Sequence, residues 1–166
     1  MTSIPINRKI YLKIFISIFI FFIDRITKIY VIHLDQVNFG KEIIVNDFLN
    51  INLIWNTGVA FGFFSFEENY FYNFLTLIIF TIIIIILVLS FKNSGIKGYA
   101  YLVIFAGASG NLFDRFFSKQ VPDFIDLHIG HIHWFVFNIA DIFITLGVIF
   151  LIMTEFFNKE KDEKKI

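Results

Sequence analysis

The 166-residue sequence contains no cysteine, only two prolines and few charged side chains, which make up 17% of the chain. Without cysteine the chain has no disulfide, no thiolate metal site and no cysteine nucleophile. Soluble domains are about one-quarter charged and about 45–50% apolar, whereas 57% of these residues are hydrophobic. A soluble fold of this length has too little interior to bury so many apolar side chains. The composition therefore excludes a soluble enzyme, a disordered chain and a nucleic-acid-binding protein, and it indicates a polytopic membrane protein.

Four hydrophobic segments are long enough to cross a membrane as helices. The second is free of charged residues, and a few polar side chains interrupt the other three. The first segment follows basic residues, as the core of a secretory signal peptide does, but Asp24-Arg25-Ile26-Thr27-Lys28 stands where a small-residue cleavage site is expected. We therefore interpret it as a retained first helix. The sequence predicts an all-α polytopic membrane protein, a single integral membrane domain over residues 1–166, with four transmembrane helices at about 10–34, 69–91, 98–117 and 136–157.

The segment between the first two helices, about residues 41–62, is predicted to be a small extracytoplasmic β segment. Apolar residues alternate from Leu49 to Trp55, as they do in a strand with one buried face. Asn56-Thr57-Gly58 then favours a turn. An apolar ribbon beside the membrane is suited to hold an extended peptide by strand addition.

The basic residues are sorted along the chain, and they predict how the helices are oriented. Nine of the fourteen lie in the N-terminal segment, the loop after the second helix or the C-terminal tail: Arg8, Lys9, Lys13, Lys92, Lys97, Lys159, Lys161, Lys164 and Lys165. Cytoplasmic segments of membrane proteins carry an excess of lysine and arginine. We therefore expect a multi-pass protein with both termini in the cytoplasm and with segments 35–68 and 116–135 outside it.

With this orientation, the polar residues that interrupt three of the helices converge on one side of the membrane. They lie near the ends of the two outward-running helices and in the first turns of the fourth. Asp24, for example, is about 21 Å along a helix that begins at Ile10, inside a hydrocarbon layer about 30 Å thick. Polar groups at this depth are costly unless they are paired or face water. They are therefore candidates for a functional site near the outer leaflet.

Two of these polar groups have a structural explanation as well as a functional one. Asp24 and Lys28 are four residues apart in the favourable order for an ion pair, which anchors a helix as readily as it contacts a substrate. Asn111, Asp114 and Arg115 share a helix face behind a run of small residues that lets another helix approach closely. Helix packing closed by an Asp–Arg bond and a functional site both remain open for this second group.

Two further aspartates are candidates for a shared catalytic pair. Asp141 shares a face of the fourth helix with Asn138 and has no basic residue within two turns along this helix. Asp123 follows Pro122, which fixes its own φ, so we expect Asp123 at a defined turn. Two carboxylates at a low-dielectric interface do not both ionise easily, so one keeps its proton while the other activates water. A shared dyad is one interpretation of this pattern, and a serine–lysine pair that uses Ser109 is a weaker one.

Three closely spaced histidines, with an aspartate nearby, raise a metal hypothesis. His128, His131 and His133, with Asp126, match neither the His-Glu-x-x-His helix nor a zinc-finger spacing. Amphipathic side chains at a membrane surface, beside Trp134, are the better explanation of this pattern. We therefore expect no metal and no cofactor.

Five stretches resemble, in order along the chain, the motifs of bacterial lipoprotein signal peptidase (signal peptidase II), an aspartic endopeptidase embedded in the inner membrane. They are Asp24-Arg25-Ile26-Thr27-Lys28, Asn56-Thr57-Gly58-Val59-Ala60-Phe61-Gly62, Gly107-Ala108-Ser109-Gly110-Asn111-Leu112-Phe113-Asp114-Arg115, Val121-Pro122-Asp123-Phe124-Ile125-Asp126 and Phe137-Asn138-Ile139-Ala140-Asp141. The resemblance covers about Ile10 to Met153, and it includes the length and the four-helix topology. Each motif alone is weak evidence, whereas five in order are specific.

The resemblance implies that Asp123 and Asp141 are the two catalytic aspartates. Asp126 also fits its motif but does not occupy the family's catalytic position. The resemblance further implies a set of residues that bind substrate or support the site: Asp24, Lys28, Asn56, Gly58, Asn111, Asp114, Arg115 and Asn138. Within this set, the asparagines of the third and fourth helices and the arginine are implied to hold the dyad and the substrate backbone.

The implied substrate is a prolipoprotein whose lipobox cysteine carries a diacylglyceryl group, cleaved on the N-terminal side of that cysteine. The resemblance also implies an enzyme of the bacterial cytoplasmic (inner) membrane that works among membrane lipids and is inhibited by the cyclic peptide globomycin. We expect a monomer with no nucleic-acid partner. The alternative is a non-enzymatic protein that couples protons or solutes through the same aspartates, although transporters usually contain repeats and this chain shows none. A third interpretation is an assembly subunit whose polar face meets partner helices.

Overall fold

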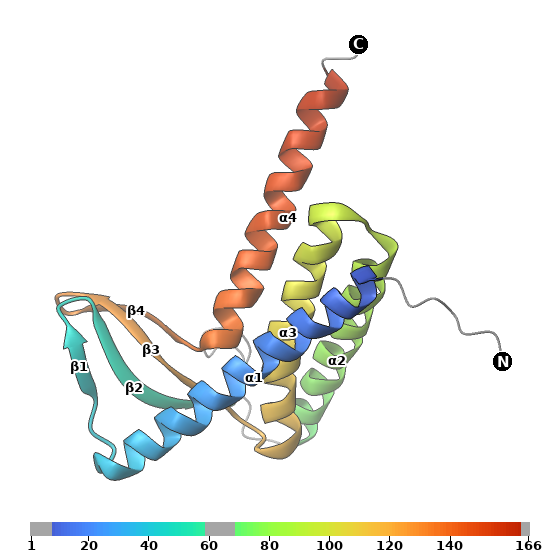
Figure 1. Cartoon of the computed structure of the whole chain (residues 1–166). Coiled ribbons are helices and arrows are strands. Elements are labelled where there is room, and N and C mark those ends of the chain that lie inside the picture. Colours follow the sequence, from blue (N-terminus) through green and yellow to red (C-terminus); the bar gives the residue numbers. More distant parts are fainter. Residues whose placement is uncertain (1–7, 59–68, 164–166) are drawn as a thin grey trace.

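The computed structural model describes residues 8–58 and 69–163 (Figure 1). Within these ranges the chain forms four helices and four strands: α1 (Arg8–Val37), β1 (Ile43–Asn46), β2 (Leu49–Asn56), α2 (Asn69–Lys92), α3 (Gly95–Phe117), β3 (Val121–Ile129), β4 (Ile132–Phe137) and α4 (Ile139–Glu163). The strands form one antiparallel sheet in the order β1-β2-β3-β4, which lies beside the helices in Figure 1. The protein is therefore helix-rich with a small antiparallel sheet.

Among the described residues, two helical segments are long and apolar enough to cross a membrane, Tyr70–Lys92 and Ile139–Phe157. Both carry many large apolar side chains on the outer surface of the protein; Phe74 in α2 and Ile152 in α4, for example, are more than half exposed. Such apolar surfaces are stable in contact with lipid but not in contact with water. α1 and α3 are interrupted by charged residues, which the structure places against each other, as described below.

The sheet differs from the sequence-based expectation. The sequence predicts β structure only between the first two helices, but β3 and β4 lie between α3 and α4. Asp123 is expected at a turn and instead lies within β3. The fourth helix is expected from about residue 136 and instead begins at Ile139, because Ile132–Phe137 pairs with β3 as a strand. Residues 59–62 of the expected β segment lie outside the described residues.

A two-residue turn accounts for the β3–β4 hairpin. Gly130 and His131 separate the two strands, and Gly130 has a φ of 61°, a conformation that glycine adopts readily and that tight hairpins require. β3 pairs with β2 on one edge and with β4 on the other. Its first four residues, Val121 to Phe124, are buried. This double pairing and burial fix the position of Asp123.

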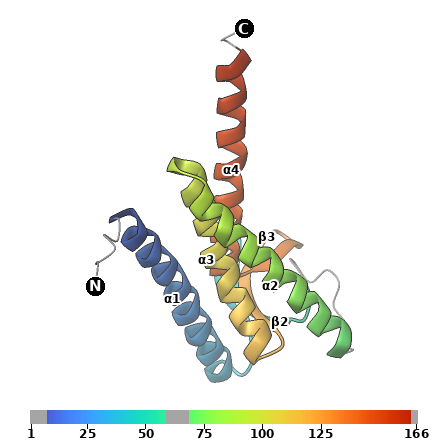
Figure 2. The ribbon, with the colours of Figure 1, turned by 90° about the vertical axis from the view of Figure 1, so that its right-hand side faces the viewer.

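α3 is the helix against which the other three pack, and Figure 2 shows them gathered around it. A Cβ added to Gly107 would lie 2.6 Å from the backbone oxygen of Ala140 in α4. A Cβ added to Gly110 would lie 2.5 Å from a carboxylate oxygen of Asp24 in α1. The expectation that this small-residue run allows close approach is therefore confirmed. Its glycines bring α1 and α4 within reach of the polar face of α3.

Replacing Gly107 by alanine is expected to destabilise the protein by about 1–3 kcal/mol. The added Cβ would meet the backbone carbonyl of Ala140, which has no side-chain rotation to relieve the contact, so α3 and α4 would have to separate. Ser109→Ala is the matched control, because the Ser109 hydroxyl bonds within its own helix, to the carbonyl of Phe105. Thermal unfolding in detergent should give a lower Tm for Gly107→Ala than for Ser109→Ala. Equal values would contradict the proposed contact.

Candidate active site

A cavity of about 270 Å³ lies where the helices meet the sheet. It is lined by residues of β2, α2, α3, β3 and α4: Asn56, Ile79, Ala108, Asn111, Arg115, Val121, Asp123, Asp141, Ile144 and Thr145. Five of the ten site residues predicted from the sequence are in this lining, and both aspartates are among them. A peptide bond placed in the cavity would therefore meet two carboxyl groups.

Asp123 reaches the cavity from β3 and is 4% exposed. Each of its carboxylate oxygens accepts a hydrogen bond, one from Nδ2 of Asn56 (2.8 Å) and one from Nδ2 of Asn138 (2.6 Å). Burial raises the pKa of Asp123 to about 6, and the nearby charge of Asp141 adds to this effect, while the two amide donors oppose it. Asp123 can therefore exchange a proton near neutral pH, as a catalytic acid or base must.

Asp141 is fixed at the start of α4 by a reciprocal pair of hydrogen bonds with Asn138. The backbone N–H of Asp141 donates to Oδ1 of Asn138, and the backbone N–H of Asn138 donates to Oδ2 of Asp141, both at 3.1 Å. This is a capping box, in which the residue before the helix and the third helical residue satisfy each other's exposed backbone donors. Nδ2 of Asn138 is left to donate to Asp123. One side chain thus caps α4 and joins the two aspartates.

Asn111 connects Asp141 to a buried lysine. Its Nδ2 donates to Oδ1 of Asp141, and its Oδ1 accepts from Nζ of Lys28, each at 2.8 Å. The Lys28 side chain is 1% exposed. An ammonium group one hydrogen-bonded residue away stabilises negative charge on the Asp141 carboxylate.

Behind the cavity, two cations and two carboxylates form a network between α1 and α3, in which all but Arg25 are buried. Asp114 accepts from Nζ of Lys28 and from Nη2 of Arg25, both at 2.7 Å. Asp24 lies 3.0 Å from the same ammonium group and 2.8 Å from the same guanidinium group. Oδ1 of Asp24 also accepts the backbone N–H of Ala140 at 3.1 Å. The four charges sum to zero, so the network joins α1 to α3 and α4 without a net buried charge.

The partner of Arg115 differs from the one that its position predicts. The sequence leaves open an Asp–Arg bond within the third helix, but Asp114 is bound to the cations of α1. Nη2 of Arg115 donates instead to the carbonyl of Gly58 (2.6 Å). The N–H of Gly58 donates to Oδ1 of Asn56 (2.8 Å), which forms the turn expected after β2. Arg115 therefore holds the segment that carries Asn56 against the cavity.

All ten predicted site residues belong to one hydrogen-bonded group, and the structure adds Arg25 to it. Its guanidinium carbon also lies 5.0 Å from the centroid of the Phe113 ring. The sequence offers a weak signal for Arg25, because this cation directly follows Asp24 at membrane depth. Its main partner, Asp114, is 89 residues away, and a local pattern does not reveal such a pair.

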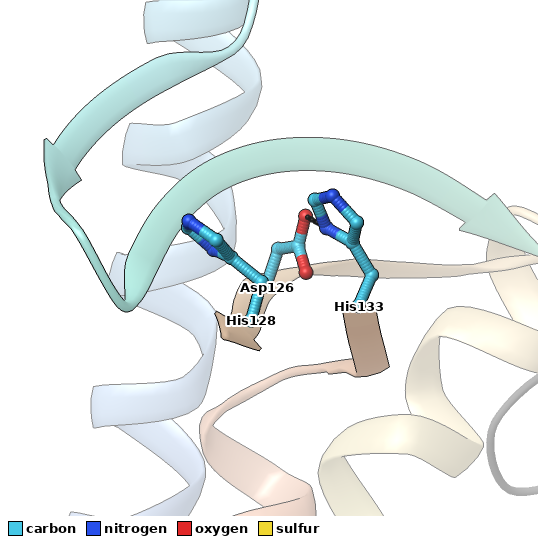
Figure 3. Close-up of side chains that lie close together, drawn as sticks. All are labelled: Asp126, His128 and His133. Atoms are coloured by element: carbon cyan, nitrogen blue, oxygen red, sulfur yellow. Dashed lines mark hydrogen bonds and ion pairs between the residues drawn. The ribbon is translucent and has the colours of Figure 1, made fainter. Parts of the chain in front are cut away.

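Asp126, His128 and His133, three of the four residues considered as metal ligands, also lie close together, but outside the cavity. Figure 3 shows Asp126 and His128 on β3 beside His133 on β4. Nδ1 of His133 lies 2.8 Å from Oδ2 of Asp126. His131 lies in the hairpin turn and is exposed. None of these residues lines the cavity that holds the two aspartates.

The chain is similar to known proteins along most of its length. The profile of the family described as signal peptidase (SPase) II matches residues 16–157 of the chain. The chain is 46% identical over 159 residues to the lipoprotein signal peptidase of Pelagibacter ubique (strain HTCC1062), which covers 95% of this chain and 96% of that protein. It is 32% identical over 153 residues to the lipoprotein signal peptidase of Hydrogenovibrio crunogenus (strain DSM 25203 / XCL-2), which covers 90% and 88%.

Two solved structures described as bacterial membrane enzymes are also similar to this chain. The first has a TM-score of 0.71 at 30% identity and covers 92% of each chain. The second has a TM-score of 0.65 at 31% identity and covers 87% of this chain and 92% of the other. The likeness therefore extends over both the helices and the sheet.

Proposed function

The chain belongs to the signal peptidase II family, a family of proteases, and we propose that Asp123 and Asp141 are its catalytic pair. The protein removes signal peptides from prolipoproteins. The observation that carries the proposal is the position of Asn138, whose side chain bonds to Asp123 while its capping bonds hold Asp141. Two carboxyl groups held in this way at one buried cavity can share a single proton.

In the proposed reaction Asp141 is the general base and Asp123 the general acid. Donors from Asn111 and Asn138 support the negative charge on Asp141. Asp141 takes a proton from a water molecule, whose oxygen attacks the scissile carbonyl carbon. Neutral Asp123 gives its proton to the carbonyl oxygen as negative charge develops there. When the C–N bond breaks, the leaving amine takes the proton held by Asp141. Asp123 takes back a hydroxyl proton as the C=O bond re-forms, and the pair returns to its starting state with one proton.

The proposal includes four membrane-spanning helices. The chain is a membrane protein, and α2 and α4 are apolar enough to span a bilayer. α1 and α3 carry charges, but these belong to the buried network of Asp24, Arg25, Lys28 and Asp114, in which each charge is paired. Paired charges that face another helix are the kind that a membrane segment tolerates. We place both termini in the cytoplasm and the cavity near the outer leaflet of the bacterial inner membrane.

The proposed substrate is a prolipoprotein whose cysteine carries a diacylglyceryl group. Its acyl chains would remain in the lipid while the bond on the N-terminal side of that cysteine enters the cavity. The cavity combines apolar lining from Ile79 and Ile144 with the two carboxyl groups, which suits a substrate that is part lipid and part peptide. In the same proposal the protein acts as a monomer, and globomycin competes for this cavity.

Cleavage of a defined substrate tests the proposed function. Purified full-length protein is incubated with a synthetic prolipoprotein, with and without the diacylglyceryl group, and the products are separated by gel mobility and identified by mass spectrometry. We expect cleavage before the modified cysteine, inhibition by globomycin and no cleavage of the unmodified substrate. Lack of cleavage, together with potential-driven proton or solute flux in vesicles, would favour the non-enzymatic alternative.

The pKa of Asp123 predicts that kcat/KM falls as the pH rises above about 6. Asp123 is neutral below about pH 6 and ionised above it. Because the mechanism needs one proton on the pair, kcat/KM should fall up to about tenfold per pH unit above that value. Asn56→Ala removes a hydrogen-bond donor that stabilises ionised Asp123. The fall in kcat/KM should therefore begin at a higher pH in this variant. If kcat/KM of the variant falls at the same pH as in wild type, Asp123 is not the group that must be protonated.

A further inference from the structure

A second convergence of polar side chains lies on the β3–β4 hairpin (Figure 3). Asp126 and His128 are two residues apart on β3, and His133 on β4 is the direct cross-strand neighbour of His128. The two imidazole rings are stacked with their centroids 5.1 Å apart. One ligand atom from each of the three residues lies within 4.8 Å of the other two. The hairpin register therefore brings one carboxylate and two imidazoles close together, although the sequence spacing matches neither the His-Glu-x-x-His helix nor a zinc-finger pattern.

Two of these side chains carry a buried polar atom that has no hydrogen-bond partner within the described part of the chain. These atoms are Oδ1 of Asp126 and Nδ1 of His128. Asp126 is 2% exposed, and only its other oxygen is bonded, to His133. Asn50, the cross-strand neighbour of Asp126 in β2, has a third such atom, its Oδ1. Buried polar atoms without a partner are costly and rare, so an Asp–His hydrogen bond alone does not account for the cluster.

We propose that Asp126, His128 and His133 form a binding site for a divalent transition-metal ion of the zinc type. Imidazole nitrogen and carboxylate oxygen are standard zinc ligands, whereas magnesium and calcium prefer oxygen ligands alone. Ligand atoms of a tetrahedral zinc site lie about 3.3 Å apart. The atoms of this cluster are within 4.8 Å of one another, so rotation of the side chains about their χ angles brings them into range.

The site is open on one side and is separate from the catalytic pair. The side chain of His133 is 50% exposed, which gives an ion access from solvent and leaves room for water as a fourth ligand. Oδ1 of Asn50 is a second candidate for that position. Asp126 lies three residues beyond Asp123 on the same strand, so a bound ion would join β3 to β4 next to the catalytic strand. Its role is to stabilise this hairpin, and the cleavage reaction does not pass through it.

Calorimetric titration with Zn²⁺ tests the site. The full-length protein is purified through a tag that contains no histidine, and wild type is expected to bind one ion per chain. His128→Asn and His133→Asn should each weaken binding by more than about tenfold, since even the loss of an outer partner of a ligand costs that much. His131→Asn changes the same residue type in the turn of the same hairpin and is the matched control, with binding like wild type. Mg²⁺ should give no saturable binding.

Two further measurements separate metal binding from misfolding. Co²⁺ bound to imidazole absorbs visible light, so Co²⁺ added to wild type should give a saturable absorption band that Zn²⁺ removes. Circular dichroism shows whether His133→Asn keeps the helix content of wild type, and Zn²⁺ should raise the Tm of wild type but not of this variant. Absence of saturable Zn²⁺ binding by wild type would overturn the proposal. Equal affinities of folded His131→Asn and folded His133→Asn would overturn it as well.

Discussion

Replacing Asp141 by asparagine is expected to abolish cleavage, with kcat lower by on the order of 10⁴-fold or more. The asparagine side chain has nearly the same shape, and its carbonyl oxygen can still accept the backbone N–H of Asn138 that Oδ2 of Asp141 accepts in the native chain. The capping box and the helix therefore persist. What the variant lacks is a group that takes a proton from water. The same argument applies to Asp123→Asn, which lacks the proton that neutral Asp123 contributes.

Asp47→Asn is the matched control for both variants. Asp47 is an exposed residue in the turn between β1 and β2, so the same chemical change there should leave cleavage of the diacylglyceryl-modified substrate unaltered. Circular dichroism and the elution volume in detergent check that each variant is folded. Substantial turnover by folded Asp141→Asn would reject the two-aspartate mechanism.

Asp114→Asn is expected to have the largest effect on stability, a loss of about 3–5 kcal/mol. Asp114 is 4% exposed and is bonded to both Arg25 and Lys28. Without its charge, buried Lys28 and partly buried Arg25 share the single carboxylate of Asp24, and the network gains a net charge in a region that solvates charge poorly. Unfolding of the purified protein by a denaturing detergent, followed by circular dichroism, measures the change.

A double variant separates the effect of net charge from the loss of individual contacts. Adding Arg25→Gln to Asp114→Asn removes one cation and one carboxylate, so the network is neutral again, while Lys28 keeps its bond to Asn111. The double variant should be more stable than Asp114→Asn alone, a non-additivity expected of charges in one network. A double variant that is less stable than Asp114→Asn would show that the individual hydrogen bonds, and not charge balance, determine the stability.

The helices and the polar residues of the site could be predicted from the sequence because their signals are local. A charge inside an apolar run stands out in a membrane segment, which is how Asp24 and Asn138 became candidates. Lys28 lies one helical turn after Asp24, and that spacing correctly indicated an ion pair, found at 3.0 Å. The assignment of Asp123 rather than Asp126 to the catalytic pair needed the family resemblance, because spacing treats the two alike.

The β3–β4 hairpin could not be predicted, for a physical reason that its residues show. Val121–Ile129 has polar residues at intervals of three and then two, at Asp123, Asp126 and His128. The interval of three, from Asp123 to Asp126, breaks the period-two pattern by which a strand is recognised. The pairing of β3 with β4 is also irregular, with an extra residue on β4 between His133 and Val136. Much of the strand is also buried, so polarity does not alternate between a dry and a wet face. The charge network was equally hidden, since Arg25 and Asp114 meet only once α1 packs against α3.

The capping box at the start of α4 has a consequence for how the active site forms during folding. The carboxylate that we assign to the reaction is also the group that closes the first turn of its own helix, and its partner Asn138 reaches the second carboxylate with the nitrogen that capping does not use. Formation of that first turn and orientation of Asp141 are therefore coupled. A newly made chain acquires a correctly aimed Asp141 at the moment when the end of α4 forms, and local fraying of the same turn would switch the protease off while the rest of the fold stays intact.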